Sequence, residues 1–202
     1  SSDLSRSGRV AFIGAVATPP VRRFGCGFAQ GVREARPIQV MIRYMTTDLD
    51  GFRDRRLARS VAEEMLGGGA DVLFPAAGLA SRDVLLVAAH AGKLGIGVDS
   101  DQEDVAPGRI VTTAVKRIDV AVTAALRALV DGTWRAGNHE MGVADGGVDW
   151  VRAGADRFLT ADQIAAIEAA RSRIAAGSLK VTADGTDCAA SAVPSIPYTK
   201  LH

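Results

Sequence analysis

The residues best suited to binding chemistry follow a short apolar run, in residues 95–102, which read GIGVDSDQ. A buried strand that ends in two carboxylates, Asp99 and Asp101, is unusual unless the acids have a role. A carboxylate at a strand end can accept hydrogen bonds from two neighbouring hydroxyls of a sugar, which fixes the orientation of the ring. Asp99 is placed for this role, whereas we expect Asp101 and Gln102 to shape the turn beyond it. The alternative is that Asp99 caps the following turn, and composition alone favours that alternative.

A second polar residue, Lys116, lies at the end of the next apolar run. It could supply a hydrogen-bond donor and balance the charge of a buried carboxylate, or it could be a solvated lysine that precedes a helix. Three glycines in RRFGCGFAQG, at positions 25, 27 and 31, lie inside an amphipathic run and not in a turn directly after a strand. Their position therefore favours close packing of a helix on a sheet over a nucleotide-binding loop.

Catalytic and metal-binding patterns are not recognisable. The three histidines, His90, His139 and His202, accompany no serine or cysteine in a nucleophile elbow. The acids that follow Asp99 lack the sixth-position glycine and the twelfth-position glutamate of an EF-hand loop. We expect no catalytic residue, no metal and no cofactor.

Two cysteines, Cys26 and Cys188, lack the CxxC spacing of a metal or redox site. The simplest interpretation is a pair of buried or incidental thiols, and the sequence leaves open whether they are paired.

Charge and aromatic content argue against a nucleic-acid partner. Lys and Arg total 24 against 23 acidic residues, and aromatic residues make up 5% of the chain. A near-neutral chain with few aromatics offers neither a general electrostatic attraction nor a stacking platform for nucleic acid. A hydrophobic content of 48% in 202 residues is ample for a packed core, so a specific pocket must carry the function.

Short apolar runs alternate with longer amphipathic ones from Arg9 to about Val130, which is the pattern of βαβ units. Strands are predicted at residues 9–15, 38–45, 71–77, 94–99 and 109–115, and helices near residues 20–36, 51–66, 81–91 and 118–130. The pattern predicts an α/β fold with a doubly wound, mainly parallel sheet. The carboxyl ends of its strands would form one rim that carries residues 15–18, 46–48, 77–79 and 99–101.

After Gly132 the pattern changes. One strand is predicted at residues 139–143, then a helix at residues 160–176 that begins with a capping box of Thr160 and Gln163, then a tail from residue 183. Residues 8–132 therefore form the ligand-binding lobe. Residues 133–202 are too few to bury a core alone and should pack on something else.

Six segments occur in the order seen in a known family: RVAFIGA, RRFGCGFAQGVREA, GADVLFPAAG, GIGVDSDQ, APGRIVTTAVKRIDVAV and GVADGGV. In these segments the chain resembles the basic membrane protein family, also called PnrA-like lipoproteins, over residues 8–180. Members are substrate-binding proteins of ABC transporters that capture purine nucleosides or related solutes.

The resemblance implies roles for individual residues. The acid that holds the ribose hydroxyls falls on Asp99, the lysine of the KR motif on Lys116, and a ligand-contacting glycine on Gly78. Thr47 and Asp48 complete the candidate set, in the loop after the second strand. Family members usually carry an aromatic residue in that loop, and its position falls near Asp48.

The resemblance also implies a periplasmic-binding-protein-like fold in which this chain is the second lobe and the first lobe is largely missing. Residues 133–202 would complete that other lobe and end in a flexible tail. The implied partners are a nucleoside-like small molecule and an ABC transporter permease, with no nucleic acid. The implied location is extracytoplasmic at the cell envelope, with membrane contact only through a lipid anchor that this sequence does not include. The alternatives are an effector-binding domain of a transcriptional regulator and, less favoured, a nucleoside-processing enzyme; we expect no enzymatic activity.

Overall fold

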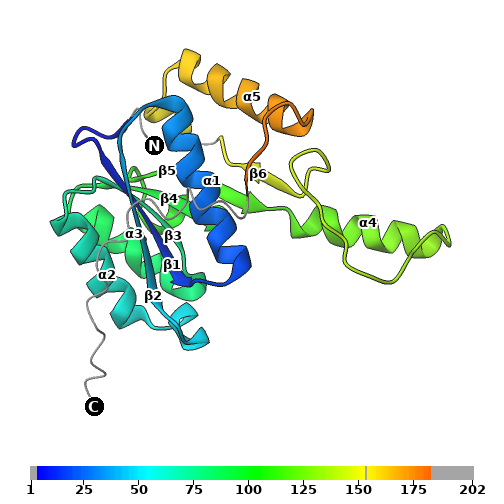
Figure 1. Ribbon diagram of the computed structural model, residues 1–202, viewed down its shortest axis with the longest axis horizontal. Helices are drawn as coiled ribbons and strands as arrows, with labels where there is room; N and C mark the ends of the chain where they lie inside the picture. The colour runs from blue at the N-terminus through cyan, green and yellow to red at the C-terminus, as the bar shows by residue number, and fades with distance from the viewer. Residues whose placement is uncertain (1–3, 153, 183–202) are drawn as a thin grey trace.

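A single six-stranded sheet organises the protein, whose computed structural model describes residues 4–152 and 154–182 (Figure 1). The strand order is β2-β1-β3-β4-β5-β6, in which β1 to β5 are parallel and β6 is antiparallel to β5. The strands are β1 (Arg9–Val16), β2 (Gln39–Thr46), β3 (Val72–Ala76), β4 (Leu94–Asp99), β5 (Ile110–Lys116) and β6 (Val148–Trp150). The prediction of a doubly wound, mainly parallel sheet is confirmed, and the first five strands lie within two residues of their predicted bounds.

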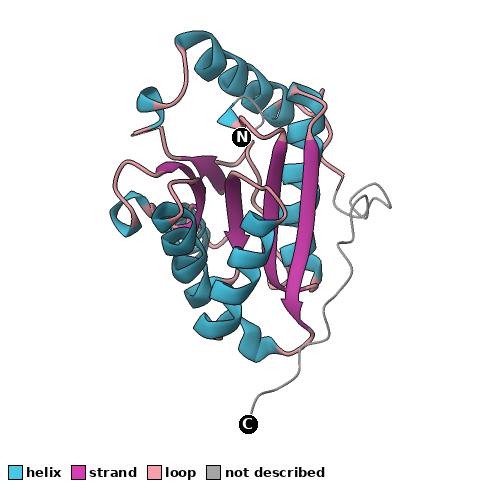
Figure 2. Cartoon of the chain, turned by 90° about the vertical axis from the view of Figure 1, so that its left-hand side faces the viewer, coloured by secondary structure: helices cyan, strands magenta, loops and turns pink. Residues whose placement is uncertain are grey.

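Helices stand on both sides of the strands (Figure 2). They are α1 (Pro19–Ala35), α2 (Arg55–Gly67), α3 (Ser81–His90), α4 (Ile118–Val130) and α5 (Ala161–Ala175). The chain moves outward from β1 to β2 and then crosses back to β3, so the winding direction reverses between β1 and β3. In open α/β sheets ligands bind at the carboxyl ends of the strands near such a reversal.

Two apolar layers hold the helices on the sheet. On one face, Ile13, Met65 and Leu73 belong to a cluster formed by α2, α3 and the strands. On the other face, Phe12 and Phe74 pack with residues of α1. Phe12, Ile13, Met65 and Leu73 are fully buried, so both layers exclude water and fix the strand ends in place.

The segment between β2 and α2 differs from the predicted single helix at residues 51–66. A short 3-10 helix (Leu49–Phe52) comes first, and α2 starts only at Arg55. Asp54 separates the two because its side chain accepts a hydrogen bond from the backbone N–H of Leu57, which caps α2.

The outer edge of the sheet is formed by β2, which is eight residues long. Its Arg43 lies 3.8 Å from Glu64 of α2, and the side chains of the two are only 13% and 22% exposed. The edge strand therefore carries a half-buried ion pair among its apolar residues.

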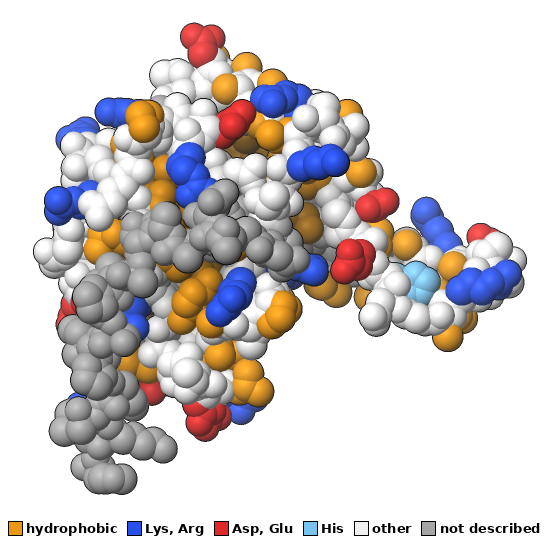
Figure 3. All heavy atoms as spheres, in the orientation of Figure 1, with side chains coloured by type: hydrophobic (Ala, Val, Ile, Leu, Met, Phe, Trp, Pro, Cys, Tyr) orange, Lys and Arg blue, Asp and Glu red, His pale blue; other side chains and the backbone are white. Residues whose placement is uncertain are grey.

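Helix α4 is the exception to the packing pattern. It projects away from the sheet and buries none of its residues (Figure 1). Five of its large apolar side chains are exposed, from 52% for Val122 to 87% for Val130. In Figure 3 hydrophobic side chains are visible on the arm that contains α4.

The prediction of a strand at residues 139–143 is wrong. These residues form a compact loop in which Gly147 N donates to Gly142 O and Gly142 N donates to the Asp145 carboxylate. These turn hydrogen bonds compete with strand pairing, and the sixth strand forms at Val148–Trp150 instead.

Helix α5 begins as predicted, with Thr160 and Gln163 forming a reciprocal capping box. It is held to the lobe by Trp150, whose Nε1 donates to Glu168, and by an ion pair of 3.0 Å between Arg171 and Asp149. The tail predicted from residue 183 lies outside the described residues.

Cys26 corrects the interpretation of incidental thiols, because it is disulfide-bonded. The other cysteine of the sequence, Cys188, lies outside the described residues. None of the helices in the described part of the chain is both long and apolar enough to span a bilayer.

Candidate functional site

The carboxyl ends of β4 and β5 bring Asp99 and Lys116 together. The two strands are neighbours, and Asp99 lies opposite Val115 in their register. The Nζ atom of Lys116 is 2.7 Å from Oδ1 of Asp99, and both side chains are about half exposed, 45% and 47%. The expectation that this lysine balances a buried carboxylate is therefore wrong in one respect, because the pair faces solvent.

The backbone at Asp99 is unusual. Its φ is +69°. All other described residues with a positive φ are glycines. A left-handed conformation is unfavourable for most side chains and is seen more often at functional sites. Among the described residues, no backbone N–H donates to the Asp99 carboxylate, so the capping alternative has no supporting contact.

The turn beyond Asp99 is shaped by its neighbours, as predicted. Gln102 accepts a hydrogen bond from Val98 N at 2.9 Å, and Asp101 accepts one from Glu103 N at 3.2 Å. Gly97 makes this turn compact, because a Cβ at that position would collide with Oγ1 of Thr113 and lie 3.0 Å from Gln102 Cβ. The backbone that presents Asp99 is thus fixed independently of its carboxylate.

An aromatic ring borders the pair. Phe24 of α1 is half-buried, and Lys116 Nζ lies 5.1 Å from the centre of its ring. The ring is held by an edge-to-face contact with Phe74 of β3, at 6.3 Å between centroids. Sequence reasoning missed Phe24 as a site residue because it treated the amphipathic run only as sheet packing. The signal was available, since Phe24 is one turn from the start of a helix that follows β1.

Tyr44, near the end of β2, packs on the same aromatic layer. Burial raises the pKa of its phenol, and the nearby positive charge of Arg22 opposes that effect. The phenol is therefore protonated at neutral pH and can act as a hydrogen-bond donor.

Gly78 lies at the start of the 3-10 turn (Gly78–Ala80) that follows β3, the neighbour of β4. It has a φ of +57°, and a Cβ there would meet Phe52 at 3.1 Å. Gly78 is exposed, but the position that a Cβ would take lies against Phe52, so a larger residue would require Phe52 to shift. Gly78 and Asp99 lie at the ends of neighbouring strands.

Thr47 and Asp48 lie farther away. They follow β2, which is three strand positions from β4, and this corresponds to about 14 Å at the usual spacing. Both are exposed, and the Asp48 carboxylate accepts a hydrogen bond from Asp50 N at 3.0 Å. The structure therefore does not bring these two candidates to the Asp99–Lys116 pair.

Groups of histidine, cysteine and acidic residues that could hold a metal ion are absent from residues 4–152 and 154–182. His90 is exposed, and His139 stacks on Trp134 with 4.5 Å between ring centroids. The arrangement at the rim provides a carboxylate, an ammonium group and an aromatic face. These are groups that bind a polar ligand with a planar part.

This fold is that of a lobe of the periplasmic-binding-protein type. Residues 1–182 match the family model described as "ABC transporter substrate-binding protein PnrA-like". The chain belongs to this family, as the sequence motifs predicted.

Curated relatives give the same family. The chain is 33% identical over 150 residues to basic membrane protein D of Borreliella burgdorferi, an alignment covering 73% of this chain and 40% of the relative. It is 33% identical over 152 residues to an uncharacterized lipoprotein of Pyrococcus abyssi, covering 68% of this chain and 37% of the relative. The matched part is therefore about two-fifths of the length of these relatives.

Solved structures show the fold. A solute-binding protein of an ABC transporter system from Aeropyrum pernix K1 superposes with a TM-score of 0.74 at 23% identity, covering 92% of this chain and 61% of that one. A transcriptional activator of the comK gene from Bacillus halodurans superposes with a TM-score of 0.76 at 21% identity, covering 88% and 60%. Both similarities concern the architecture.

Proposed function

We propose that this chain is the ligand-binding lobe of a solute-binding protein in an ABC-type uptake system, and that its ligand is a purine nucleoside or a similar ribose-containing molecule. The observation that carries the proposal is the Asp99 carboxylate. It is held in a left-handed backbone conformation and half exposed, with Lys116 on one oxygen. A second carboxylate oxygen remains for hydroxyl donors.

Three side chains would each contact a different part of such a ligand. Asp99 accepts hydrogen bonds from two adjacent hydroxyls, and Lys116 orients the carboxylate and donates to a ligand oxygen. Phe24 offers an apolar aromatic face beside them, which suits a planar base. Gly78, exposed in the turn after β3, would add backbone contacts to the ligand. Thr47 and Asp48 remain candidates for contacts on the far side of the rim.

A two-lobe arrangement explains helix α4. Relatives are longer than this chain, and α4 exposes an apolar surface that buries nothing in this lobe. We propose that α4 and the loop of residues 133–147 belong to the core of a second lobe. That residues 133–202 complete the second lobe stays a prediction. The contacts of α5 run against it for that helix, because α5 is anchored to this lobe through Trp150 and Asp149 of β6. Ligand binding would close the two lobes by a hinge movement.

The proposed location is the cell envelope, outside the cytoplasm, with a transporter permease as partner. The Pyrococcus abyssi relative is named a lipoprotein. The disulfide at Cys26 supports an oxidising compartment, since structural disulfides are rare in the cytosol.

A regulatory effector-binding domain is the second candidate, because the comK activator of Bacillus halodurans shares the architecture. Its ligand site would lie at the same rim. A nucleoside-processing enzyme is less favoured, since the rim pairs its carboxylate with a lysine and no nucleophile–base pair is evident among the described residues.

Calorimetry with inosine, guanosine and adenosine tests the proposal. Asp99→Asn keeps the shape of the side chain but removes its charge, so we expect affinity to fall about 10- to 150-fold, the equivalent of about 1.5–3 kcal/mol for hydrogen bonds to a charged group. Asp101→Asn, in the turn beyond, is the matched control and should bind like the wild type. Equal affinities for the wild type and Asp99→Asn would contradict the role of Asp99. Equal affinities for inosine and its 2′-deoxy analogue would contradict recognition of two hydroxyls.

A further inference from the structure

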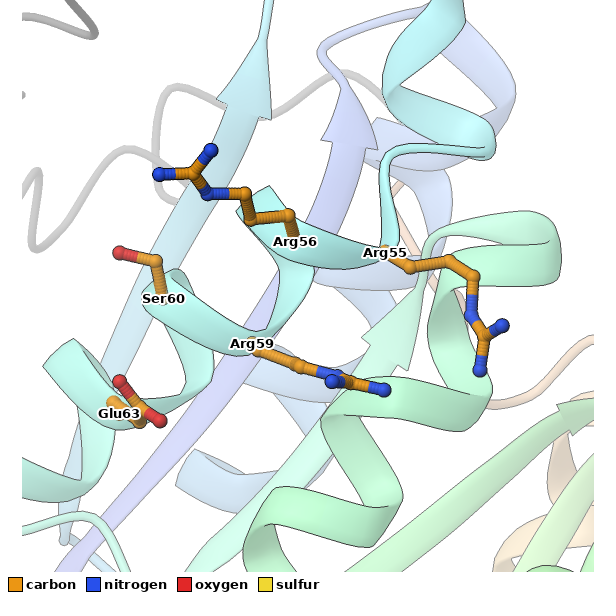
Figure 4. A pocket seen from close by; sticks show the side chains of 5 residues that line it. All are labelled: Arg55, Arg56, Arg59, Ser60 and Glu63. Atoms are coloured by element: carbon orange, nitrogen blue, oxygen red, sulfur yellow. The ribbon is translucent and has the colours of Figure 1, made fainter. Parts of the chain in front are cut away.

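The first two turns of α2 carry a concentration of arginine that the proposed ligand site does not use. Residues 53–60 read RDRRLARS, with four arginines and one acid, Asp54, whose carboxylate caps the helix. Arg55, Arg56 and Arg59 line a shallow depression of about 450 Å³ together with Ser60 and Glu63 (Figure 4). The chain as a whole has a net charge of +1, so this local excess is not a reflection of its composition.

Two of these arginines are held in place by a buried acid. Asp83 of α3 is fully buried, and its two oxygens accept hydrogen bonds from Arg55 Nε at 2.7 Å and Arg59 Nε at 2.8 Å. Burial disfavours the charged carboxylate, but the hydrogen bonds and charges of Arg55 and Arg59 together keep the pKa of Asp83 below its ordinary value. Asp83 is therefore ionised at neutral pH and orients both guanidinium groups.

The arrangement leaves donors directed at solvent. The side chains of Arg55 and Arg59 are 61% and 56% exposed although Asp83 is not exposed at all. Asp83 engages Nε of Arg55, so both terminal nitrogens of that guanidinium remain available. Figure 4 shows Arg55 and Arg59 extending toward α3, with Arg56 pointing to the other side of α2. Arg56 is exposed and forms no ion pair with a described residue.

The arginine face lies at the carboxyl edge of the sheet. A helix that follows a parallel strand starts at the carboxyl edge of the sheet, so the first turns of α2 belong to the same edge as Asp99. The 3-10 helix before α2 packs over this edge, where a Cβ on Gly51 would lie 3.3 Å from the carbonyl oxygen of Ala15 in β1. A molecule seated on α2 would thus share this edge with Asp99 but lie on the other face of the sheet from Phe24.

We propose that the outer face of the first turns of α2 is a docking surface for an acidic segment of a partner protein, with carboxylates engaging Arg55 and Arg59 on one side of the helix and Arg56 on the other. Oriented guanidinium forks match carboxylates through paired hydrogen bonds. An anionic membrane surface fits less well, because the excess charge covers two turns of one helix and the chain is nearly neutral. The inference rests on the proposed function only in taking the partner to be a transporter component.

Titration of the 202-residue chain with capped hexaglutamate at low salt, followed by NMR, tests the proposal. The Nε–H signals of Arg55 and Arg59 are the specific probes, because Asp83 protects these protons from exchange. We expect both signals to shift with saturation, no shift with capped hexaglutamine, and at least tenfold weaker peptide binding by Arg56→Glu. Arg36→Glu, an exposed residue after α1, makes the same change in net charge and should bind like the wild type.

Three results would overturn the proposal. The arginine signals could stay unshifted while other residues respond, Arg36→Glu could lose as much affinity as Arg56→Glu, or vesicles with anionic lipid could bind the chain more tightly than the peptide does. Nucleoside calorimetry on Arg56→Glu keeps the two proposals separate. Unchanged nucleoside affinity with lost peptide binding supports the docking surface, and lost peptide binding is measurable whether or not a nucleoside binds.

Discussion

Asp99 should contribute little to the stability of the ligand-free lobe, although it occupies the centre of the proposed site. Its ion pair with Lys116 joins two half-exposed side chains, and such pairs contribute about 0.2–1 kcal/mol. Asparagine also tolerates the left-handed backbone at φ +69°. Asp99→Asn should therefore lower the free energy of unfolding by at most about 1 kcal/mol.

Replacing Asp99 by a β-branched residue separates the energetic effect of the backbone conformation from that of the carboxylate. Asp99→Val loses the same ion pair and adds about 1–2 kcal/mol for a left-handed conformation that valine rarely adopts. We expect a total loss of about 1–3 kcal/mol. The measurement is urea unfolding followed by circular dichroism and by the fluorescence of Trp134 and Trp150, with equal dependence on urea for all variants.

Two outcomes would refute this reasoning. A loss above about 2 kcal/mol in Asp99→Asn would mean that the carboxylate holds the turn, as the capping alternative states. Equal stability of Asp99→Val and Asp99→Asn would mean that the left-handed backbone carries no cost. The expected result, small loss of stability with large loss of affinity, is the behaviour of a residue whose cost is offset elsewhere in the fold.

Three further predictions concern the supports of the site. Gly97→Ala should destabilise the lobe by about 1–3 kcal/mol in urea unfolding, because the new methyl collides with Thr113, whereas Gly31→Ala, with open space around it in α1, should stabilise by about 0.5–1 kcal/mol. Stability should fall as the pH drops below about 4, because the lowered pKa of Asp83 means that the unfolded chain takes up the proton first; Asp83→Asn should flatten that dependence in thermal melts at several pH values. Thr160→Ala should cost about 1 kcal/mol through loss of the α5 cap, and no change in thermal denaturation would contradict the capping box.

The parallel sheet could be predicted because each strand of the lobe is a short apolar run followed by a helical pattern. The run before Asp99 and the run before Lys116 are predicted as strands, and a parallel pair necessarily brings their carboxyl ends together. The sequence thus predicts that both side chains lie on one edge of the sheet, and the observed pairing of β4 with β5 brings them into contact. The solvent exposure of this pair could not be predicted, because it depends on which other segments cover the carboxyl ends of the strands.

The wrong predictions concern segments whose conformation is determined by local contacts. Residues 139–143 have a strand-like pattern, but Asp145 and the glycines at 142 and 147 close a turn there. The predicted helix at residues 51–66 is interrupted because Asp54 caps a later start. Phe24 was assigned to packing alone, since periodicity shows which face of a helix is apolar but not that one ring on that face reaches the strand ends.

The charged pair at the outer edge of the sheet has a consequence for the behaviour of the protein in concentrated solution. An eight-residue apolar strand with a free edge is a template for pairing with a second chain, and this is how many proteins begin to aggregate. Arg43 and Glu64 place charge at that edge with little exposure. Among the described residues no further strand pairs with the outer side of β2. A second strand that paired there would have to cover these charges further, so the ion pair disfavours fibril-like growth from this edge.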